Sequence, residues 1–140
     1  MAALYRTAAS LRVFGDDLEP EEVSRLLGCE PSAWERRGQR TIGGFTGNVR
    51  VATTGSWRLS AVKRVPGNLD AQIDELLSKV SQDLGVWKDI ADRFRVDLFC
   101  GLFMDGPIEG ISVSASSLAS LGSRGIELVL DIYGSEPGDT

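Results

Sequence analysis

The sequence of 140 residues contains no histidine and only two cysteines. Without histidine, Ser-His-Asp and Cys-His nucleophilic catalysis and every histidine-ligated metal site are excluded. Cys29 and Cys100 stand far apart and form no CxxC pair, which predicts two reduced, buried thiols and no zinc site. An enzyme of this composition would depend on carboxylates, lysine, tyrosine or a metal held by oxygen ligands alone. The composition therefore argues against most classes of enzyme.

Long apolar runs are also absent, because no stretch approaches the roughly twenty residues that span a membrane. The N-terminal stretch MAALYRTAASLRVF is interrupted by Arg6 and Arg12, which is atypical of a signal peptide. We therefore expect a cytoplasmic protein that does not bind membranes. The hydrophobic fraction of 42% and the charged fraction of 25% are ordinary for one globular domain. We expect this domain over residues 1–133 and a flexible tail over residues 134–140.

Five carboxylates stand within seven positions of the stretch FGDDLEPEEVSRLLG, residues 14–28. Pro20 suits the first position of a helix, and Glu22 suits the third position of a capping box. Gly28 suits the left-handed position that ends a helix. Negative charge in the first turn is also favoured by the helix dipole. The stretch is therefore interpreted as a helix start, with Asp16 and Asp17 in the preceding turn and no metal site.

Hydrophobic alternation predicts strands over residues 10–14, 49–53, 57–60, 95–103, 110–114 and 126–133. From Leu69 to Trp87, apolar residues recur at helical spacing and predict one long amphipathic helix of about twenty residues. Short helices are predicted after Glu19 and within SASSLASLG. The stretch GGFTGN is predicted to be a turn, because it lacks the spacing of a phosphate loop and no helix follows it.

These elements predict a single α+β domain with a mainly antiparallel sheet. The long helix and the two short helices are expected to pack on one face of that sheet. The order of strand, short helix and glycine stop occurs twice, over residues 10–28 and 110–122. The repetition suggests duplicated β-α-β halves.

Side-chain alternation along the predicted strands divides the sheet into two faces. One face is wholly apolar and is expected to pack against the long helix; it contains Leu11, Val13, Val96, Leu98, Cys100, Leu102, Leu128, Leu130 and Ile132. The other face combines aromatic and charged side chains, namely Arg12, Phe14, Asp97, Phe99, Phe103, Glu127, Val129, Asp131 and Tyr133. Such a face is typical of a binding surface. The alternative is that the glycine- and threonine-rich hairpins or a second subunit cover it.

Positive charge is concentrated in residues 34–64, which contain seven basic residues and one acidic residue. Trp34, Phe45 and Trp57 are interspersed among them, as in proteins that bind single-stranded nucleic acid. The sequence pI of about 4.7 argues against a nucleic-acid partner, because most of the molecule would repel phosphates. The alternatives are an anionic small ligand, an acidic protein partner or internal neutralisation of the acidic helices.

Six stretches follow one another between residues 11 and 133: LRVFGDDLEPEEVSRLLGCEPS, RRG, GSWRLS, LDAQIDELLSKV, VDLFCGLF and GISVSASSLASLGSRGIELVLDIY. Together they resemble the small bacterial proteins grouped as the domain of unknown function 4279 family. The resemblance implies a stand-alone bacterial domain of α+β type and supplies neither an activity nor catalytic residues. The recurrent residues to which it points are Gly28, Pro31, Arg37, Gly38, Trp57 and Tyr133.

Two of these residues have alternative roles. Trp57 opens a short strand after a Gly-Ser turn, so it either fills the core or anchors an interface. Arg37 either caps helix carbonyl groups, pairs with Asp16 or Asp17, or presents its guanidinium group to an anion.

Three hypotheses of function follow. The first is a non-enzymatic protein-binding module, similar to an immunity or antitoxin protein, whose aromatic and acidic sheet face steers a basic partner. The second is a small-ligand or carboxylate-based enzymatic domain that would use Asp16, Asp17, Asp97, Arg36, Arg37 and Tyr133. The third is a homodimer that buries the aromatic face across a two-fold axis.

The first hypothesis is preferred, so a protein partner or a second copy of the chain is expected. The candidate binding residues are Arg37, Trp57, Asp97, Phe99, Phe103 and Tyr133. No catalytic residue, metal ligand or cofactor is predicted.

Overall fold

The computed structural model describes residues 2–44 and 47–135. The helices are α1 (Pro20–Leu27), α2 (Leu69–Lys79), α3 (Leu84–Arg93) and α4 (Ala115–Ser123). The strands are β1 (Ala2–Ala3), β2 (Arg6–Gly15), β3 (Ala33–Glu35), β4 (Arg40–Ile42), β5 (Val49–Val51), β6 (Gly55–Ser60), β7 (Arg95–Phe103), β8 (Glu109–Gly110) and β9 (Glu127–Tyr133). The predicted turn GGFTGN includes Phe45 and Thr46, and the predicted tail includes residues 136–140; these positions lie outside the described residues.

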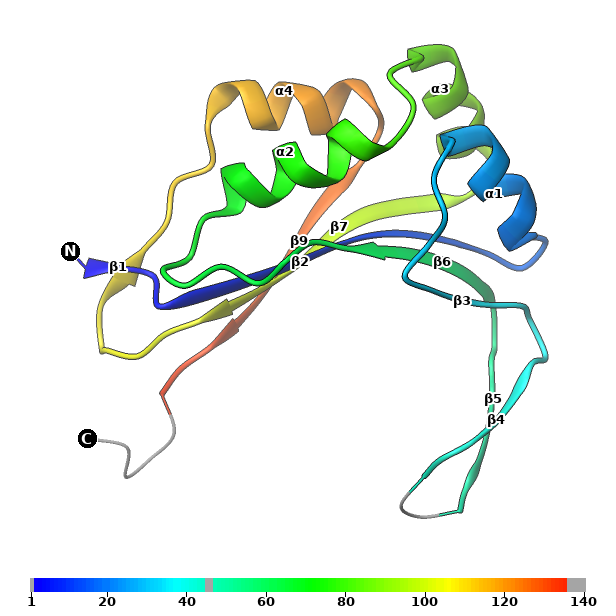
Figure 1. Cartoon of the computed structure of the whole chain (residues 1–140), viewed down its shortest axis with the longest axis horizontal. Helices are drawn as coiled ribbons and strands as arrows, with labels where there is room; N and C mark the ends of the chain where they lie inside the picture. Colours follow the sequence, from blue (N-terminus) through cyan, green and yellow to red (C-terminus); the bar gives the residue numbers. More distant parts are fainter. Residues whose placement is uncertain (1, 45–46, 136–140) are drawn as a thin grey trace.

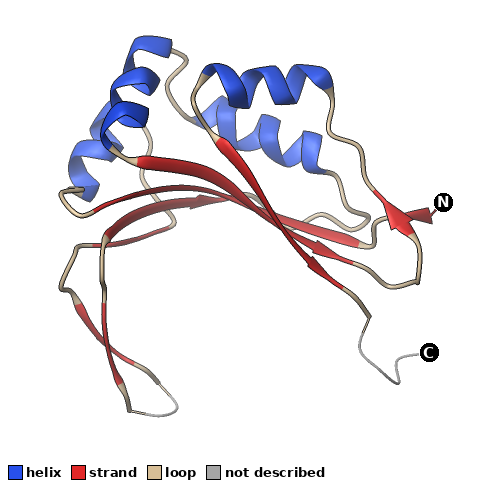
Figure 2. Ribbon diagram, turned by 180° about the vertical axis from the view of Figure 1, so that it is seen from behind, coloured by secondary structure: helices blue, strands red, loops and turns tan. Residues whose placement is uncertain are grey.

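Five strands form the main sheet in the order β3-β6-β2-β7-β9. Neighbouring strands are antiparallel except β7 and β9, which are parallel. Figures 1 and 2 show that α1, α2, α3 and α4 lie together on one face of this sheet. The predicted α+β class is therefore confirmed.

The α1 helix begins and ends where the sequence predicts. Pro20 occupies its first turn, and Glu21 and Glu22 place negative charge near its N-terminus. At its C-terminus Gly28 has a φ of 69°, and its N–H donates to the carbonyl oxygen of Ser24. The acidic stretch is thus the start of a helix, as the local sequence predicts.

The predicted long helix is wrong, because two helices, α2 and α3, replace it. The Nε2 of Gln82 donates to the carbonyl oxygen of Leu77 (2.7 Å), which satisfies the C-terminal end of α2. The Oδ1 of Asp83 accepts from the N–H of Gly85 (2.8 Å) and caps the start of α3. The apolar period continues across this break because both helices bury a face in the same core, where Trp87 belongs to α3.

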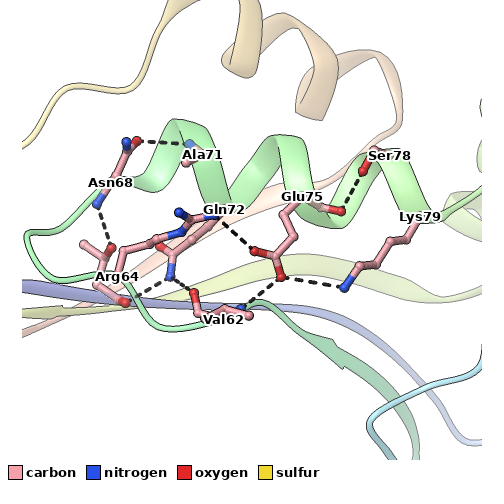
Figure 3. Close-up of polar contacts among 9 residues, drawn as sticks. Val62, Arg64, Asn68, Ala71, Gln72, Glu75, Ser78 and Lys79 are labelled. Atoms are coloured by element: carbon pink, nitrogen blue, oxygen red, sulfur yellow. Dashed lines mark hydrogen bonds and ion pairs between the residues drawn. The ribbon is translucent and has the colours of Figure 1, made fainter.

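Two polar side chains of α2 fix it to the sheet, as Figure 3 shows. Gln72 is fully buried, and its Nε2 donates to the carbonyl oxygens of Thr7 (2.9 Å) and Val62 (3.0 Å). The carboxylate of Glu75 accepts from the N–H of Val62 (2.9 Å) and lies 3.6 Å from Arg64. These bonds satisfy backbone groups of β2 and of the segment that follows β6, and they hold α2 above both.

The predicted strand over residues 110–114 is wrong, since the two residues of β8 pair with β1 and the chain then turns towards α4. The N–H of Ser114, the N-cap of α4, donates to Asp70 of α2 and holds this turn. The two β-α-β units also differ in the sheet. β7 and β9 are adjacent, whereas β6 lies between β2 and β3, so the two halves are not equivalent.

The apolar face of the sheet is buried beneath the helices along β2 and β7, as predicted. The prediction fails on β9, where Leu130 is 44% exposed and Ile132 is 66% exposed. Figure 1 shows the reason, because the second half of β9 runs beyond the helices.

Candidate binding face

The face of the main sheet opposite the helices forms the candidate site. The hairpin of β4 and β5 leaves the sheet beside β3 and projects away from it, as Figures 1 and 2 show. Neither this hairpin nor any described helix lies across the face. The face is therefore open in a single described chain.

Arginine and aromatic side chains dominate this open face, because alternate residues of β2, β6, β7 and β9 point away from the helices. We call it the arginine–aromatic face, and it consists of Arg6, Arg12, Phe14, Arg58, Arg95, Asp97, Phe99, Phe103 and Tyr133. Register places Arg12 of β2 between Arg58 of β6 and Asp97 of β7.

The centre of the face is an ion pair. The Nε and Nη2 atoms of Arg12 donate to the two carboxylate oxygens of Asp97 at 2.7 and 2.9 Å. Only 2% of the Asp97 side chain is exposed, because the side chains of Arg12 and Arg95 lie over it; Arg95 comes within 4.0 Å. This bidentate geometry is the arrangement in which a buried carboxylate is best compensated.

The arginines are stacked against aromatic rings. The guanidinium carbon of Arg12 lies 4.4 Å from the ring centroid of Phe99 and 5.0 Å from that of Phe14. Arg6 lies 4.1 Å from the ring centroid of Phe103, which in turn stacks on Tyr133 with centroids 4.8 Å apart. Cation–π contact orients each guanidinium group over a ring and leaves its edge free to donate hydrogen bonds.

Two arginines of the face, Arg6 and Arg58, have no counter-charge in the part of the chain that the structure describes. Within the described residues, neither Arg6 nor Arg58 forms an ion pair. The Nε atom of each is buried and has no hydrogen-bond partner there. Arg58 stands directly opposite Arg12 on the neighbouring strand, and like charges in such pairs are destabilising. These two side chains are therefore positioned to gain from an added anion.

Four of the six predicted binding residues, Asp97, Phe99, Phe103 and Tyr133, lie together on this face, and Arg12 and Phe14 lie there as the alternation predicted. The exposed fraction of Tyr133 is 45%, while Phe99 and Phe103 are half-buried. That these residues bind a partner stays a prediction.

The two other predicted site residues lie elsewhere. Trp57 is fully buried on the helix side of β6, where its Nε1 donates to the Oγ of Ser24 (3.0 Å) and joins the sheet to α1. Arg37 is exposed in the loop after β3, with its Nη1 3.7 Å from the Oδ2 of Asp16. Of the alternatives for Trp57 and Arg37, the core position and the aspartate pairing are the ones that the structure supports.

Sequence reasoning missed Arg6, Arg58 and Arg95. Arg6 and Arg12 are both even-numbered residues of β2 and so share one face. The run of Thr7, Ala8 and Ala9 shows no clear alternation, so the first half of that strand cannot be recognised from sequence. Arg58 alternates with Trp57 and Leu59 in GSWRLS, which was a detectable signal. The omission of these arginines made the face appear more acidic than it is.

A family model described as Domain of unknown function (DUF4279) matches residues 3–135, nearly the whole chain. The chain belongs to the DUF4279 family. The resemblance drawn from the sequence is thus confirmed. Neither the comparison with curated proteins nor that with solved structures gave a match. Because the family description assigns no activity, the function of this DUF4279 chain has to be argued from its surface.

The residues of the enzymatic hypothesis do not converge on one site in the DUF4279 structure, although Arg37 pairs with Asp16. Asp16 directly follows Gly15 at one end of β2, whereas Tyr133 lies beside Phe103, opposite Arg6 at the other end. β2 rises about 3.4 Å per residue, so the nine steps from Arg6 to Gly15 separate its two ends by roughly 30 Å. In the described part of the chain, no cluster of three His, Cys, Asp or Glu side chains could hold a metal ion.

Both thiols are free; Cys100 lies in the core, whereas Cys29 is only partly buried, so the prediction of two buried thiols is wrong for Cys29. Burial, together with the charge of Asp97, raises the pKa of the Cys100 thiol to about 12. A thiol with this pKa is protonated at neutral pH and is a poor nucleophile.

Much of the basic segment is neutralised within the DUF4279 chain. Arg36 lies 3.3 Å from Glu19 and also contacts Glu21, and Arg50 contacts Glu35. Because these pairs are mainly exposed, each contributes little to stability. Among residues 2–44 and 47–135, no helix is long and apolar enough to cross a membrane.

Proposed function

We propose that this DUF4279 protein is a non-enzymatic binding module whose arginine–aromatic face receives an acidic segment of another protein. The observation that carries the proposal is the pair of half-buried arginines, Arg6 and Arg58, that lack a carboxylate partner among the described residues. A guanidinium group matches the two oxygens of a carboxylate, and an added carboxylate would supply the counter-charge that both arginines lack among the described residues.

The aromatic rings favour a protein partner of this kind. Phe99 and Phe103 are half-buried between arginines, so they offer apolar contact area beside the donors. Arginine and aromatic side chains are the residues that supply most binding energy in protein interfaces. A partner with acidic side chains next to apolar ones would use both.

The partner proposed here is acidic, whereas the sequence hypothesis was of a basic partner. The sequence hypothesis of a basic partner rested on Asp97, Glu127 and Asp131. Four arginines share the face with these carboxylates, and Asp97 is already compensated by Arg12. Because the remaining carboxylates lie on β9 at one margin, the centre of the face favours an acidic partner.

The spacing of the two arginines constrains the length of that segment. Arg58 stands opposite Arg12, six residues along β2 from Arg6, which corresponds to roughly 20 Å. An extended peptide rises about 3.3 Å per residue, so acidic side chains about six residues apart would reach both arginines.

A protein partner is favoured over nucleic acid because of the whole molecule's charge. The net charge is −5, and Glu127 and Asp131 border the face on β9. Affinity for a phosphate backbone comes mainly from charge, which the net negative charge weakens, whereas a protein segment also gains apolar contacts with the aromatic rings of the face. The proposal includes that this protein is cytoplasmic and that it masks its partner, as immunity proteins and antitoxins do.

Fluorescence anisotropy with labelled poly-L-glutamate tests the proposal. We expect binding that weakens as salt is added, and about tenfold weaker binding for Arg6→Gln and for Arg58→Gln, since each removes a charge-assisted contact. Arg25→Gln is the matched control: Arg25 is exposed on α1, on the helix side of the sheet, and the substitution removes the same charge.

The outcome that contradicts the proposal is equal loss of affinity in all three variants, since binding would then depend on net charge alone. A labelled oligo-dT that binds more tightly than poly-L-glutamate, with the same dependence on Arg6 and Arg58, would show instead that the face serves nucleic acid.

A further inference from the structure

A second surface, the free edge of β9, is independent of the arginine–aromatic face. β9 is an outer strand of the main sheet and has seven residues, whereas β3 at the opposite edge has three. No described strand lies on its outer side. Proteins usually shorten, bend or cover such edges, because unpaired N–H and C=O groups are a template for another strand.

The direction of the backbone groups of β9 follows from one hydrogen bond. The carbonyl oxygen of Tyr133 accepts from the N–H of Met104 beyond β7 (2.9 Å), so Tyr133 faces inwards. Successive residues of a strand direct their backbone groups to opposite sides. Leu128, Leu130 and Ile132 therefore present their N–H and C=O groups at the free edge.

Two of these residues, Leu130 and Ile132, are apolar side chains that the helices leave uncovered, while Leu128 packs against the core. The side chains of Leu130 and Ile132 are 44% and 66% exposed on the helix side of the sheet. The free edge thus combines unpaired backbone groups with exposed aliphatic side chains. A partner that adds a strand here would satisfy the unpaired backbone groups and bury the exposed aliphatic side chains.

We propose that the partner is a second copy of this chain, whose β9 pairs antiparallel with β9 of the first about a two-fold axis at Leu130. Leu130 is the central residue of β9, so this register pairs the two strands over their full length. Leu130 faces Leu130 of the second copy, and Leu128 faces Ile132. The edge is self-complementary, as an isologous interface requires.

The acidic residues of β9 select this register. With Leu130 on the axis, Glu127 faces Tyr133 of the second copy, and Val129 faces Asp131. A shift by two residues in one direction sets Glu127 opposite Asp131, and the opposite shift sets Asp131 opposite Asp131. Like charges in directly opposed positions are destabilising. A shift by one residue would set outward backbone groups against inward ones.

The dimer would extend the proposed binding surface. A two-fold axis that relates antiparallel edge strands is perpendicular to the sheet, so the helices of both copies lie on one side. The two arginine–aromatic faces then lie side by side on the other side. The edge pairing does not depend on what those faces bind.

Light scattering over a concentration series is the first test. We expect the wild-type mass to rise from 15.1 kDa towards twice that value. Leu130→Lys should weaken dimerisation at least about tenfold, because it sets two lysines opposite each other at the axis. Ile108→Lys is the matched control, since Ile108 is 69% exposed in the turn before β8. A wild-type chain that stays monomeric throughout the series would overturn the proposal.

Cysteine cross-linking tests the register in a Cys29→Ser background, which leaves only the buried Cys100. The Cα atoms of residue 130 in the two copies would lie about 5.5 Å apart, within the range for a disulfide. Those of residue 132 would lie roughly 14 Å apart. Leu130→Cys should therefore form a covalent dimer on mild oxidation, and Ile132→Cys should not. Equal cross-linking of both variants, or of neither, would overturn the register.

Discussion

At the scale of single residues, the most informative side chain is Asp97. It lies on the open face of the sheet, yet its carboxylate is almost completely buried beneath Arg12 and Arg95. A carboxylate without water needs a partner of good geometry, and the two hydrogen bonds from Arg12 supply it. The arginine layer therefore stabilises the sheet as well as presenting charge to solvent.

This arrangement predicts that Arg12→Gln lowers the free energy of unfolding by about 3 kcal/mol, because Asp97 would stay buried without its main counter-charge. The double variant Arg12→Leu, Asp97→Leu should recover most of the loss, since no uncompensated charge remains. Urea unfolding of the wild type and the variants measures both effects. A double variant as unstable as Arg12→Gln alone would mean that the buried pair itself, and not the orphaned carboxylate, determines the stability.

The residue scale also explains which parts of the site were predictable. Alternation along β7 is regular, so Asp97, Phe99 and Phe103 were assigned to one face from sequence. The small residues at the start of β2 carry no alternation, and Arg6 was therefore missed. Whether Trp57 fills the core or anchors an interface was not decidable from its own strand. It depends on α1, whose Ser24 accepts the indole hydrogen bond.

At the scale of elements, local signals predicted the α1 helix and the strands β6, β7 and β9, because each has a clear cap or alternation. The break between α2 and α3 was missed because it depends on Gln82, whose side chain bonds backward to α2. The strands β1, β3 and β4 have two or three residues, too few for a period to be detected. Their pairing depends on neighbours distant in sequence.

Asp70 connects two of these elements. Its Oδ1 accepts from the N–H of Ser114 (2.9 Å) and from the Oγ of Ser117 (2.8 Å), so the start of α2 holds the start of α4. The hydrogen bonds from these two residues lower the pKa of Asp70 below its usual value of 3.8. A lowered pKa means that the charged form is favoured by folding.

The stabilisation from Asp70 is therefore fully present above pH 3.8 and is lost as the pH falls through the lower pKa of the folded protein. Asp70→Asn should cost about 1 kcal/mol near neutral pH and progressively less in acid. Asp74→Asn, in the next turn of α2, removes an exposed charge without these bonds and is the control. Urea unfolding over a pH series measures both; a constant cost at all pH values would contradict this assignment.

At the scale of the whole molecule, the hairpin of β4 and β5 is separate from the main sheet. Its apolar side chains bury little, since Ile42 is 72% exposed and Val49 is 52% exposed. It forms its own two-stranded sheet, and an isolated hairpin is marginally stable in water. The N–H of Ala52 donates to the carbonyl oxygen of Gln39 (2.9 Å), and the N–H of Gly38 donates to the carbonyl oxygen of Ala52 (2.8 Å), so the base of the hairpin is closed and the chain can be joined there.

We therefore expect that replacing residues 40–51 by two glycines changes the free energy of unfolding by less than about 1 kcal/mol. The affinity for poly-L-glutamate should stay within about twofold, because the proposed contacts belong to the sheet and exposed charges elsewhere act weakly. Arg58→Gln in the shortened chain is the matched control and should weaken binding as it does in the full chain. If the shortened chain folds and no longer binds, the basic hairpin holds the acidic partner and the open sheet face does not.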